Sequence, residues 1–210
     1  MRLKNKSWAR PFIATHPEII RSNPLENWKE ETDRRFKRYH LEIGCGKGGF
    51  ITSLARQQPN DCFIGIERAL TAIAIAGKKV ESQQLSNVHL WFNDVSKLEV
   101  IIPAQTFQTI YLNFSDPWPK IRHHKRRLTA DSFLRLYDRI LIPQGIIKMK
   151  TDNLELIRFS KANFAKSGYV ILEYSEDYSQ LEFGDVPTEY ELAFRAKGLP
   201  IYRLVVRKAI

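Results

Sequence analysis

Short apolar runs and longer stretches with helical spacing alternate along the chain from residue 38 onward. The short runs predict strands at 38–43, 62–67, 88–92, 107–113, 145–150, 169–174 and 201–207. The spacing of apolar residues predicts helices at 48–57, 69–83, 129–140 and 153–166, and a polar helix is expected at 25–35. Strands that alternate with helices predict an α/β fold with a doubly wound, Rossmann-like and mostly parallel sheet. No clear helix separates the last two strands, so an antiparallel strand is expected near the C-terminus.

Residues 1–24 stand apart from this pattern. They are basic at Arg2, Lys4, Lys6 and Arg10, contain three of the ten prolines, and show no sustained apolar period. We expect this segment to be a basic N-terminal arm, extended and ordered only by docking or by a ligand. Residues 25–210 are expected to form a single domain.

The composition limits the kind of partner that the protein is expected to bind and the cell compartment in which it is expected to work. The 210 residues include 33 Lys and Arg against 23 Asp and Glu, a net charge of +10. This excess suggests a polyanion such as nucleic acid, although a merely basic solvated surface would have the same charge. The two cysteines cannot build a disulfide framework, no Cys/His cluster has zinc spacing, and no apolar run could span a membrane. We therefore expect a soluble, cytoplasmic protein without a metal site or a membrane partner.

A glycine loop, residues 42–49, follows the first predicted strand and opens a helix. It reads Glu42-Ile43-Gly44-Cys45-Gly46-Lys47-Gly48-Gly49. Gly44, Gly46 and Gly49 fit the G-x-G-x-x-G fingerprint of dinucleotide-binding proteins. The same residues fit the E-x-G-x-G-x-G pattern of class I S-adenosylmethionine methyltransferases. Glu42 favours the second interpretation, because an acid beside the loop suits a cationic sulfonium or amino group better than a pyrophosphate.

Acidic and amide side chains end the next two predicted strands. Glu67 lies 23 residues after Gly44 and can accept hydrogen bonds from the two hydroxyls of a ribose. Asn93 and Asp94 follow the third strand, where they could meet the adenine edge of a nucleoside or simply cap a turn. A nucleoside-containing ligand at the carboxyl ends of the strands fits this pattern.

Two further motifs follow the fourth predicted strand. The acid–proline loop, residues 113–119, reads Asn113-Phe114-Ser115-Asp116-Pro117-Trp118-Pro119, and its two prolines hold Asp116 rigidly at the ligand end of the sheet. The basic run, residues 120–127, follows at once. Its position beside the presumed active site indicates contacts with nucleic-acid phosphates, and the residues expected to make them are Arg122, Lys125, Arg126 and Arg127.

Together these motifs resemble the bacterial tRNA (guanine-N7-)-methyltransferases, a family of class I S-adenosylmethionine-dependent enzymes. The D-P-W-P-K stretch from Asp116 to Lys120, with the basic run behind it, is the specific part of the likeness. The E-I-G-x-G form of the glycine loop, Thr151-Asp152 after the fifth strand and the Thr188–Glu191 segment also match. The resemblance runs from about residue 38 to the end and does not reach the N-terminal arm.

The resemblance implies methyl transfer from S-adenosylmethionine to N7 of a guanine in the variable loop (guanine 46) of tRNA. It assigns Asp116 to catalysis and to the cofactor site. It assigns Glu42, Glu67 and Asp94 to the cofactor, to which the glycine loop adds Gly44 and Gly46 and the end of the third strand adds Asn93. The substrate contacts that it implies are Lys120, Asp152, Thr188, Tyr190 and Glu191. Ser115 stands where the family usually has proline, which loosens the loop around Asp116.

Guanine N7 has a free lone pair at neutral pH, so the expected reaction is an in-line displacement without a general base. Positioning and electrostatics would supply the catalysis, with Asp116 and Asp152 stabilising the cationic product. Two other functions fit part of the sequence. A nicotinamide-dependent oxidoreductase leaves the basic run and the acid–proline loop unexplained, and a non-catalytic RNA-binding protein leaves Glu42, Glu67 and Asp94 unexplained. The sequence is compatible with a monomer or a homodimer.

Overall fold

A computed structural model describes residues 4–22, 35–97, 101–179 and 184–209, and these form two compact units, Met1–Ile102 and Pro103–Ile210. Most of the helix predicted at 25–35 lies outside the described residues. The division of the sequence into an arm of 24 residues and one domain stays a prediction.

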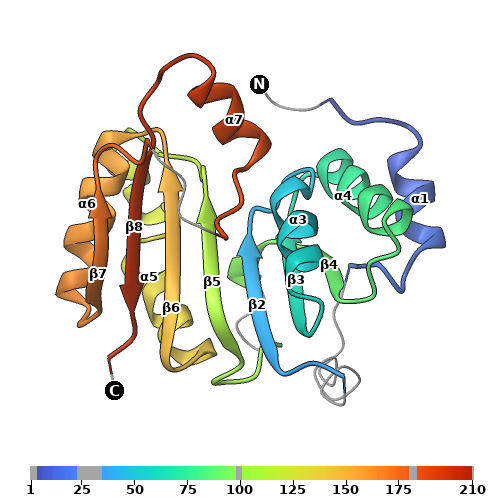
Figure 1. Ribbon diagram of the computed structural model, residues 1–210, viewed down its shortest axis with the longest axis horizontal. Coiled ribbons are helices and arrows are strands. Elements are labelled where there is room, and N and C mark those ends of the chain that lie inside the picture. Colours follow the sequence, from blue (N-terminus) through green and yellow to red (C-terminus); the bar gives the residue numbers. More distant parts are fainter. Residues whose placement is uncertain (1–3, 23–34, 98–100, 180–183, 210) are drawn as a thin grey trace. The chain divides into compact units, whose positions relative to one another are not determined.

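The described part of the first unit is built on parallel strands (Figure 1). These are β1 (Ile20–Arg21), β2 (Arg38–Ile43), β3 (Asp61–Glu67) and β4 (Val88–Phe92), which pair in the order β1-β4-β3-β2. The helices of its described part are α1 (Ala9–Thr15), α3 (Gly49–Gln57) and α4 (Leu70–Ser82), followed by the 3₁₀ turn η1 (Val95–Lys97). The predicted strands and helices between residues 38 and 92 are confirmed to within two residues at each end.

The N-terminal segment differs from the extended arm expected from the sequence. Its described part contains α1, which lies beside α4, and β1, which pairs in parallel with β4. Ile20 is buried, and a Cβ on Gly77 of α4 would come within 2.5 Å of the Ile20 side chain, so this glycine admits the close approach. The ammonium of Lys78 lies 4.0 Å from the centre of the Trp8 ring. The expectation of an extended arm was wrong because tertiary contacts, which a seven-residue helix requires, leave no local period in the sequence.

The second unit combines parallel and antiparallel strands. It contains β5 (Phe107–Asn113), η2 (Ile121–Arg126), α5 (Asp131–Ile140), β6 (Leu141–Thr151), α6 (Leu154–Lys166), β7 (Val170–Ser175), α7 (Glu189–Arg195) and β8 (Tyr202–Arg207). β5 and β6 are parallel, and β8 runs antiparallel between β6 and β7 (Figure 1). The expected antiparallel strand near the C-terminus is therefore confirmed. The seven-residue helix α7 between β7 and β8 was not predicted.

Each unit buries its own apolar core. The largest fully buried side chains of the first unit include Trp91 and Phe63, and those of the second include Tyr137, Phe107 and Phe164. The α/β class expected from the sequence, with mostly parallel strands, is confirmed by these elements. Among the described residues, no helix is both long and apolar enough to cross a membrane.

Candidate functional site

The glycine loop makes a tight turn between β2 and α3 in the first unit. Gly44, Gly46 and Gly48 have φ angles of 77°, 55° and 74°, a backbone region in which side chains cost free energy. The Gly44 N–H donates a hydrogen bond to the Ile66 carbonyl over 2.8 Å, which ties the loop to β3. A Cβ on Gly48 would lie 2.7 Å from the Cβ of Ala76, so this glycine brings the loop against α4.

Two of these glycines leave room above the backbone. A Cβ built on Gly44 or on Gly46 would meet no atom within 4 Å, in contrast to Gly48. Open space over a backbone without side chains is what a closely approaching ligand needs. This cradle fits a nucleoside-type cofactor, and Glu42, Glu67, Asn93 and Asp94 lie in the same unit. Asp116, which is also expected to contact the cofactor, belongs to the second unit, and that contact stays a prediction.

Glu67 connects the end of β3 with the glycine loop. Its Oε2 accepts the Gly46 N–H over 3.1 Å, and its Oε1 accepts the Ala69 N–H over 2.7 Å. Each carboxylate oxygen has two lone-pair positions, so both oxygens keep capacity for ribose hydroxyls. The backbone therefore fixes the orientation of the carboxylate before a ligand binds.

Glu42 and Cys45 are the buried polar side chains of the loop. Glu42 is 3% exposed at the end of β2. Burial, with the charges of Glu42 and Glu67 nearby, raises the pKa of the Cys45 thiol well above its ordinary value. A thiol with a raised pKa stays protonated and is a poor nucleophile, so Cys45 is a packing residue.

Asn93 and Asp94 follow β4 as the sequence indicated. Burial acts to raise the pKa of Asp94, but hydrogen bonds from the Ser96 amide and hydroxyl outweigh it and the pKa is lowered. Those bonds are 3.0 and 2.8 Å long. The Asn93 side chain accepts the Asp94 N–H over 2.8 Å and donates to the Ser22 carbonyl over 3.1 Å. This pair is thus held in place as an ionised acid and an oriented amide.

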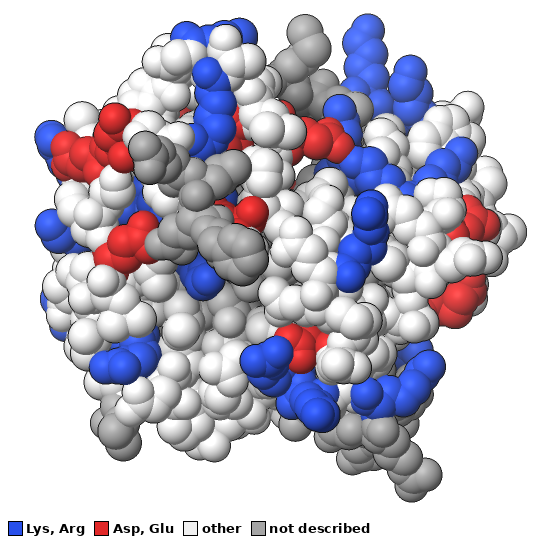
Figure 2. All heavy atoms as spheres, in the orientation of Figure 1, with Lys and Arg blue, Asp and Glu red and all other residues white. Residues whose placement is uncertain are grey.

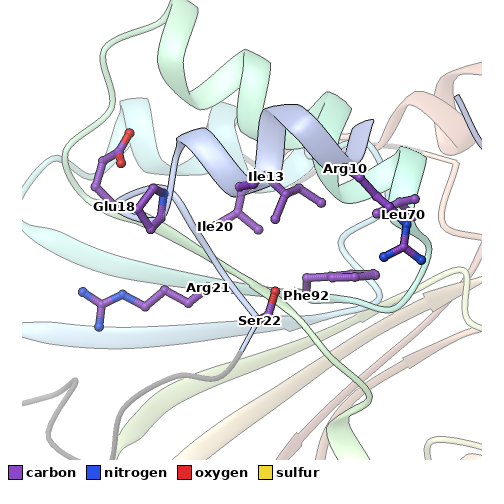
Figure 3. Close-up of a pocket in the computed structure, with 10 residues that line it drawn as sticks. Arg10, Ile13, Glu18, Ile20, Arg21, Ser22, Leu70 and Phe92 are labelled. Atoms are coloured by element: carbon purple, nitrogen blue, oxygen red, sulfur yellow. The ribbon is translucent and has the colours of Figure 1, made fainter. Parts of the chain in front are cut away.

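A pocket of about 820 Å³ is lined by residues that include Phe92 and Ser22 (Figure 3). It lies between the N-terminal segment, the first residue of α4 and the last residue of β4. Ile13, Ile20, Leu70 and Phe92 give it an apolar lining, and Arg10, Glu18, Arg21 and Ser22 supply its polar groups. The sequence does not predict this pocket, because α1 and β1, which line it, leave no local period along the chain.

The acid–proline loop in the second unit has a strained backbone. Phe114 and Trp118, which flank Asp116, have φ angles of 49° and 43°, values that non-glycine residues rarely adopt. The Phe114 N–H donates to the Lys150 carbonyl over 2.8 Å, which anchors the start of the loop on β6. Asp116 is exposed at the centre of the loop. Strained backbone of this kind clusters at functional sites.

The structure brings three of the expected substrate-side features together. The Tyr190 ring lies 5.1 Å from the Phe114 ring and is stacked on Phe194 at 4.8 Å. Lys150, near the end of β6 and two residues before Asp152, pairs with Glu191 of α7 at 3.0 Å. Burial and the charge of Asp152 raise the pKa of Tyr190. The acid–proline loop, the residue after β6 and the start of α7 thus share one region of the second unit.

Thr188 and Glu191 have a local structural role. They form a capping box, in which the Thr188 hydroxyl accepts the Glu191 N–H over 2.9 Å and the Glu191 side chain accepts the Thr188 N–H. Glu191 is 0% exposed and pairs with Lys150 at 3.0 Å and with Arg195 at 2.7 Å. The T-x-x-E spacing signals such a box in a sequence and could have predicted α7. A contact between Thr188 and the substrate stays a prediction, whereas the buried and paired Glu191 side chain is not available for one in this structure.

The basic run forms η2 and presents most of its cations to solvent. Lys120, Arg122, Lys125 and Arg126 are exposed, and the Arg126 guanidinium lies 5.0 Å from the centre of the Trp118 ring. Figure 2 shows lysines and arginines spread over the face in view, with acidic side chains among them, so overall charge alone marks no single site.

Arg127 is the exception in the basic run and corrects the sequence analysis. It is 1% exposed, and its guanidinium donates to the carbonyls of Pro117 and Trp118 and to Glu155. A side chain held in this way is not available to a phosphate. The prediction of a phosphate contact therefore does not hold for Arg127 in this structure, whereas it stays a prediction for Arg122, Lys125 and Arg126.

The described residues contain no cluster of three or more His, Cys, Asp and Glu side chains that could hold a metal ion. The chemistry available to the described sites is that of backbone amides, carboxylates, aromatic rings and cations. The open backbone of Gly44 and Gly46, with the oriented carboxylate of Glu67, suits a nucleoside cofactor. The exposed carboxylate of Asp116, followed by the cationic turn η2, suits a nucleobase of a polyanion such as RNA.

Comparisons with known proteins agree with this chemistry. A protein-family model described as "Putative methyltransferase" matches residues 37–204. The chain is 41% identical to the tRNA (guanine-N(7)-)-methyltransferase of Lactobacillus johnsonii, over 97% of each chain. It is 42% identical to the protein of that name from Geobacillus sp. (strain WCH70), over 99% of this chain and 96% of the other.

Solved structures support the fold at lower identity. An antibiotic-related methyltransferase matches with a TM-score of 0.68 at 18% identity, covering 90% of this chain and 96% of its own. The 16S rRNA methyltransferase KamB matches with a TM-score of 0.68 at 12% identity, covering 87% of this chain and 93% of its own. These likenesses confirm the α/β fold class.

Proposed function

Since this chain belongs to the tRNA (guanine-N7-)-methyltransferase family, we propose that it methylates N7 of a guanine in the variable loop (guanine 46) of tRNA. S-adenosylmethionine is the methyl donor of such an enzyme. The reaction takes place in the cytoplasm, where tRNA is present, and needs no metal ion.

The first unit holds the cofactor in this proposal. The open backbone of Gly44 and Gly46 accepts the ligand closely, and Glu67, already oriented by two N–H groups, accepts the ribose hydroxyls. Asn93 and Asp94 contact the adenine end, and Glu42 balances the positive charge of the ligand. When bound, the cofactor supplies an electrophilic methyl group on a sulfonium.

The second unit orients the guanine. Because N7 carries a lone pair and no proton, no side chain has to act as a general base. Asp116 and Asp152 accept hydrogen bonds from guanine N1 and N2 and stabilise the positive charge that develops on the ring. Tyr190, Lys120 and Thr188 contact the substrate in this proposal. Glu191, which is 0% exposed and paired with Lys150 and Arg195, holds the start of α7 in place.

The tRNA is held through its phosphates by the basic run. Arg122, Lys125 and Arg126 are exposed on η2 and neutralise several phosphates together. Folded RNA is recognised largely through shape and backbone, and a target base must leave its stack to react. The cationic turn η2 begins five residues beyond Asp116. It can therefore hold the RNA backbone while the displaced base reaches the carboxylate.

The observation that carries the proposal is the cradle of Gly44 and Gly46 with Glu67 fixed beside it. Its test is the transfer of a labelled methyl group to bulk tRNA, followed by chemical cleavage at N7-methylguanine. We expect cleavage at one position in the variable loop. Thermal stabilisation by S-adenosylhomocysteine, and none by NAD, excludes the oxidoreductase. Label on another atom or nucleotide, or stabilisation by NAD alone, would contradict the proposal.

A further inference from the structure

Arg127 differs from every other cation of the basic run in its surroundings. It directly follows η2 and is 1% exposed, whereas Arg122, Lys125 and Arg126 are exposed. Arginine is almost never fully buried unless it is paired. The burial of this one residue therefore calls for a role within the protein.

The guanidinium of Arg127 connects two segments of the second unit. Its Nε donates to the Pro117 carbonyl over 2.8 Å, and its Nη2 donates to the Trp118 carbonyl over 3.3 Å. Nη2 also lies 2.6 Å from Oε1 of Glu155, in the first turn of α6. The guanidinium carbon lies 4.6 Å from the centre of the Phe159 ring, also on α6.

The acid–proline loop needs donors from outside itself. Pro117 and Pro119 have no N–H group, so they cannot form the backbone hydrogen bonds that usually hold a turn. Trp118 between them has a positive φ angle, which a non-glycine residue keeps only where its surroundings enforce it. Arg127 donates to the carbonyls of Pro117 and Trp118, the two residues that follow Asp116.

The other end of the bridge lies close to the second candidate acid. Glu155 is three residues after Asp152, and α6 begins between them with Asn153 as its N-cap, whose side chain accepts the Leu156 N–H. One planar side chain thus ties the loop of Asp116 to the helix start that follows Asp152. Arginine suits this task because its donors are fixed in one rigid fork.

We infer that Arg127 is a positioning residue for methyl transfer, which holds the acid–proline loop, and with it Asp116, against the start of α6. The inference rests on the proposed function for the reaction, but the contacts that carry it do not depend on the substrate. Arg127 acts through Asp116 and contacts neither the tRNA nor the cofactor.

A contact with tRNA phosphate is the alternative role for Arg127. The hydrogen bond and charge of Arg127 lower the pKa of Glu155, so that carboxylate is ionised and already balances the guanidinium. A phosphate would have to displace Glu155 and two carbonyls from a buried site. The positioning of the acid–proline loop by Arg127 requires no such rearrangement.

Three variants test the inference. Arg127→Lys keeps the charge but loses the fork that reaches two carbonyls and a carboxylate. Glu155→Gln keeps an oxygen acceptor but removes the ionic partner. Arg135→Lys, an exposed arginine on α5 of the same unit, is the matched control.

Two measurements are made on each purified variant. Hydrogen–deuterium exchange of peptides covering residues 113–123 reports the loop without any ligand. Turnover and KM for tRNA, with the salt dependence of binding, report the reaction. For Arg127→Lys we expect faster exchange in these peptides and turnover at saturating tRNA about tenfold lower or more. The KM and the salt slope should stay near wild type, and Arg135→Lys should match wild type throughout.

The results that would overturn the role of Arg127 differ from those that would contradict the proposed function. A wild-type exchange pattern in Arg127→Lys would overturn the inference, and so would wild-type turnover with a flatter salt slope, which indicates a phosphate contact. If Arg127→Lys does not fold, Glu155→Gln decides, with a smaller change in the same direction expected and none overturning the inference. A wild-type protein that fails to methylate tRNA would contradict the proposed function. The exchange data would still show whether Arg127 holds the acid–proline loop against the start of α6.

Discussion

The backbone N–H of Gly46 donates a hydrogen bond to Oε2 of Glu67 over 3.1 Å, so the Glu67 side chain helps to join the glycine loop to the end of β3. The acid that is expected to hold the ribose is therefore also part of the loop's own structure. Replacement of this acid should affect the ligand and the loop together.

Glu67→Ala should weaken the binding of S-adenosylhomocysteine at least tenfold. The variant loses the acceptor of two ribose hydrogen bonds, each worth about 1.5–3 kcal/mol at most when the acceptor is charged. Isothermal titration calorimetry measures the change, with Arg56→Ala on α3 as the control at an exposed position outside the cradle. Unchanged affinity in Glu67→Ala would remove this residue from the cofactor site.

Gly44→Ala and Gly48→Ala should have opposite profiles. At Gly44 the added Cβ meets no protein atom, so stability should fall by only about 1 kcal/mol, from the positive φ angle, while cofactor affinity should fall more than tenfold. At Gly48 the Cβ overlaps with Ala76, and stability should fall by about 3 kcal/mol. Urea unfolding and calorimetry measure the two effects. A Gly44→Ala protein with wild-type affinity would mean that no ligand approaches this backbone.

Simultaneous replacement of Arg122, Lys125 and Arg126 with Ala should weaken tRNA binding and flatten its salt dependence. Each lost phosphate contact should reduce the slope of log affinity against log salt by about 0.7–0.9. Arg127 is left intact, because its removal would disturb the acid–proline loop. Filter binding over a salt series measures the slope, and joint replacement of the exposed Arg56, Arg135 and Lys166 with Ala is the control for the loss of three charges. A salt slope equal to that of wild type would show that η2 is a solvated surface that does not contact tRNA phosphates.

Ionised Asp185 should stabilise the folded protein, and this stabilisation should be lost in acid. Burial acts to raise the pKa of Asp185, but Lys150 at 2.6 Å, the Tyr178 hydroxyl and Arg203 outweigh it, so the folded-state pKa is lowered. A lowered pKa contributes stability above the unfolded value of about 3.9, and this is lost as the pH falls through the folded value.

Urea unfolding between pH 5 and pH 3 measures this effect. The free energy of unfolding of wild type should fall more steeply with decreasing pH than that of Asp185→Asn. Asp177→Asn, at an exposed position, should keep the wild-type slope. Equal slopes for wild type and Asp185→Asn would show that the ion cluster around Lys150 does not couple to folding.

Local signals in the sequence were sufficient for most of the sheet and for the motifs. The apolar runs of β2, β3 and β4 and the glycine loop are each contiguous, so their residues predict their structure without knowledge of distant contacts. The placement of Glu67 beside the loop followed from strand topology, and the structure adds the hydrogen bond to Gly46.

Features that depend on distant partners were not predictable. Arg127 looks like its neighbours in the basic run, and only the carbonyls of Pro117 and Trp118 and the side chain of Glu155 distinguish it. Helix α1 depends on α4 in the same way. Glu191 carries a local signal as a capping residue, but its pairing with Lys150, 41 residues away, leaves none.

Asp116 is the residue on which the proposed chemistry depends most. It is exposed on a loop whose two prolines and two strained residues fix the backbone, so its carboxylate is oriented before the reaction. Because no proton leaves N7, the carboxylate acts as a charge and as a hydrogen-bond acceptor. Asp116→Asn keeps the size of the side chain and removes the charge.

Single-turnover transfer of labelled methyl to saturating tRNA, with wild type and Asp116→Asn side by side, tests this account most directly. We predict that the rate of N7 methylation falls roughly 10²-fold or more in Asp116→Asn, the scale of losing one oriented electrostatic contact, while tRNA affinity changes little. A wild-type rate in Asp116→Asn would contradict the account, and the group that stabilises the methylated guanine would then have to be sought around Asp152.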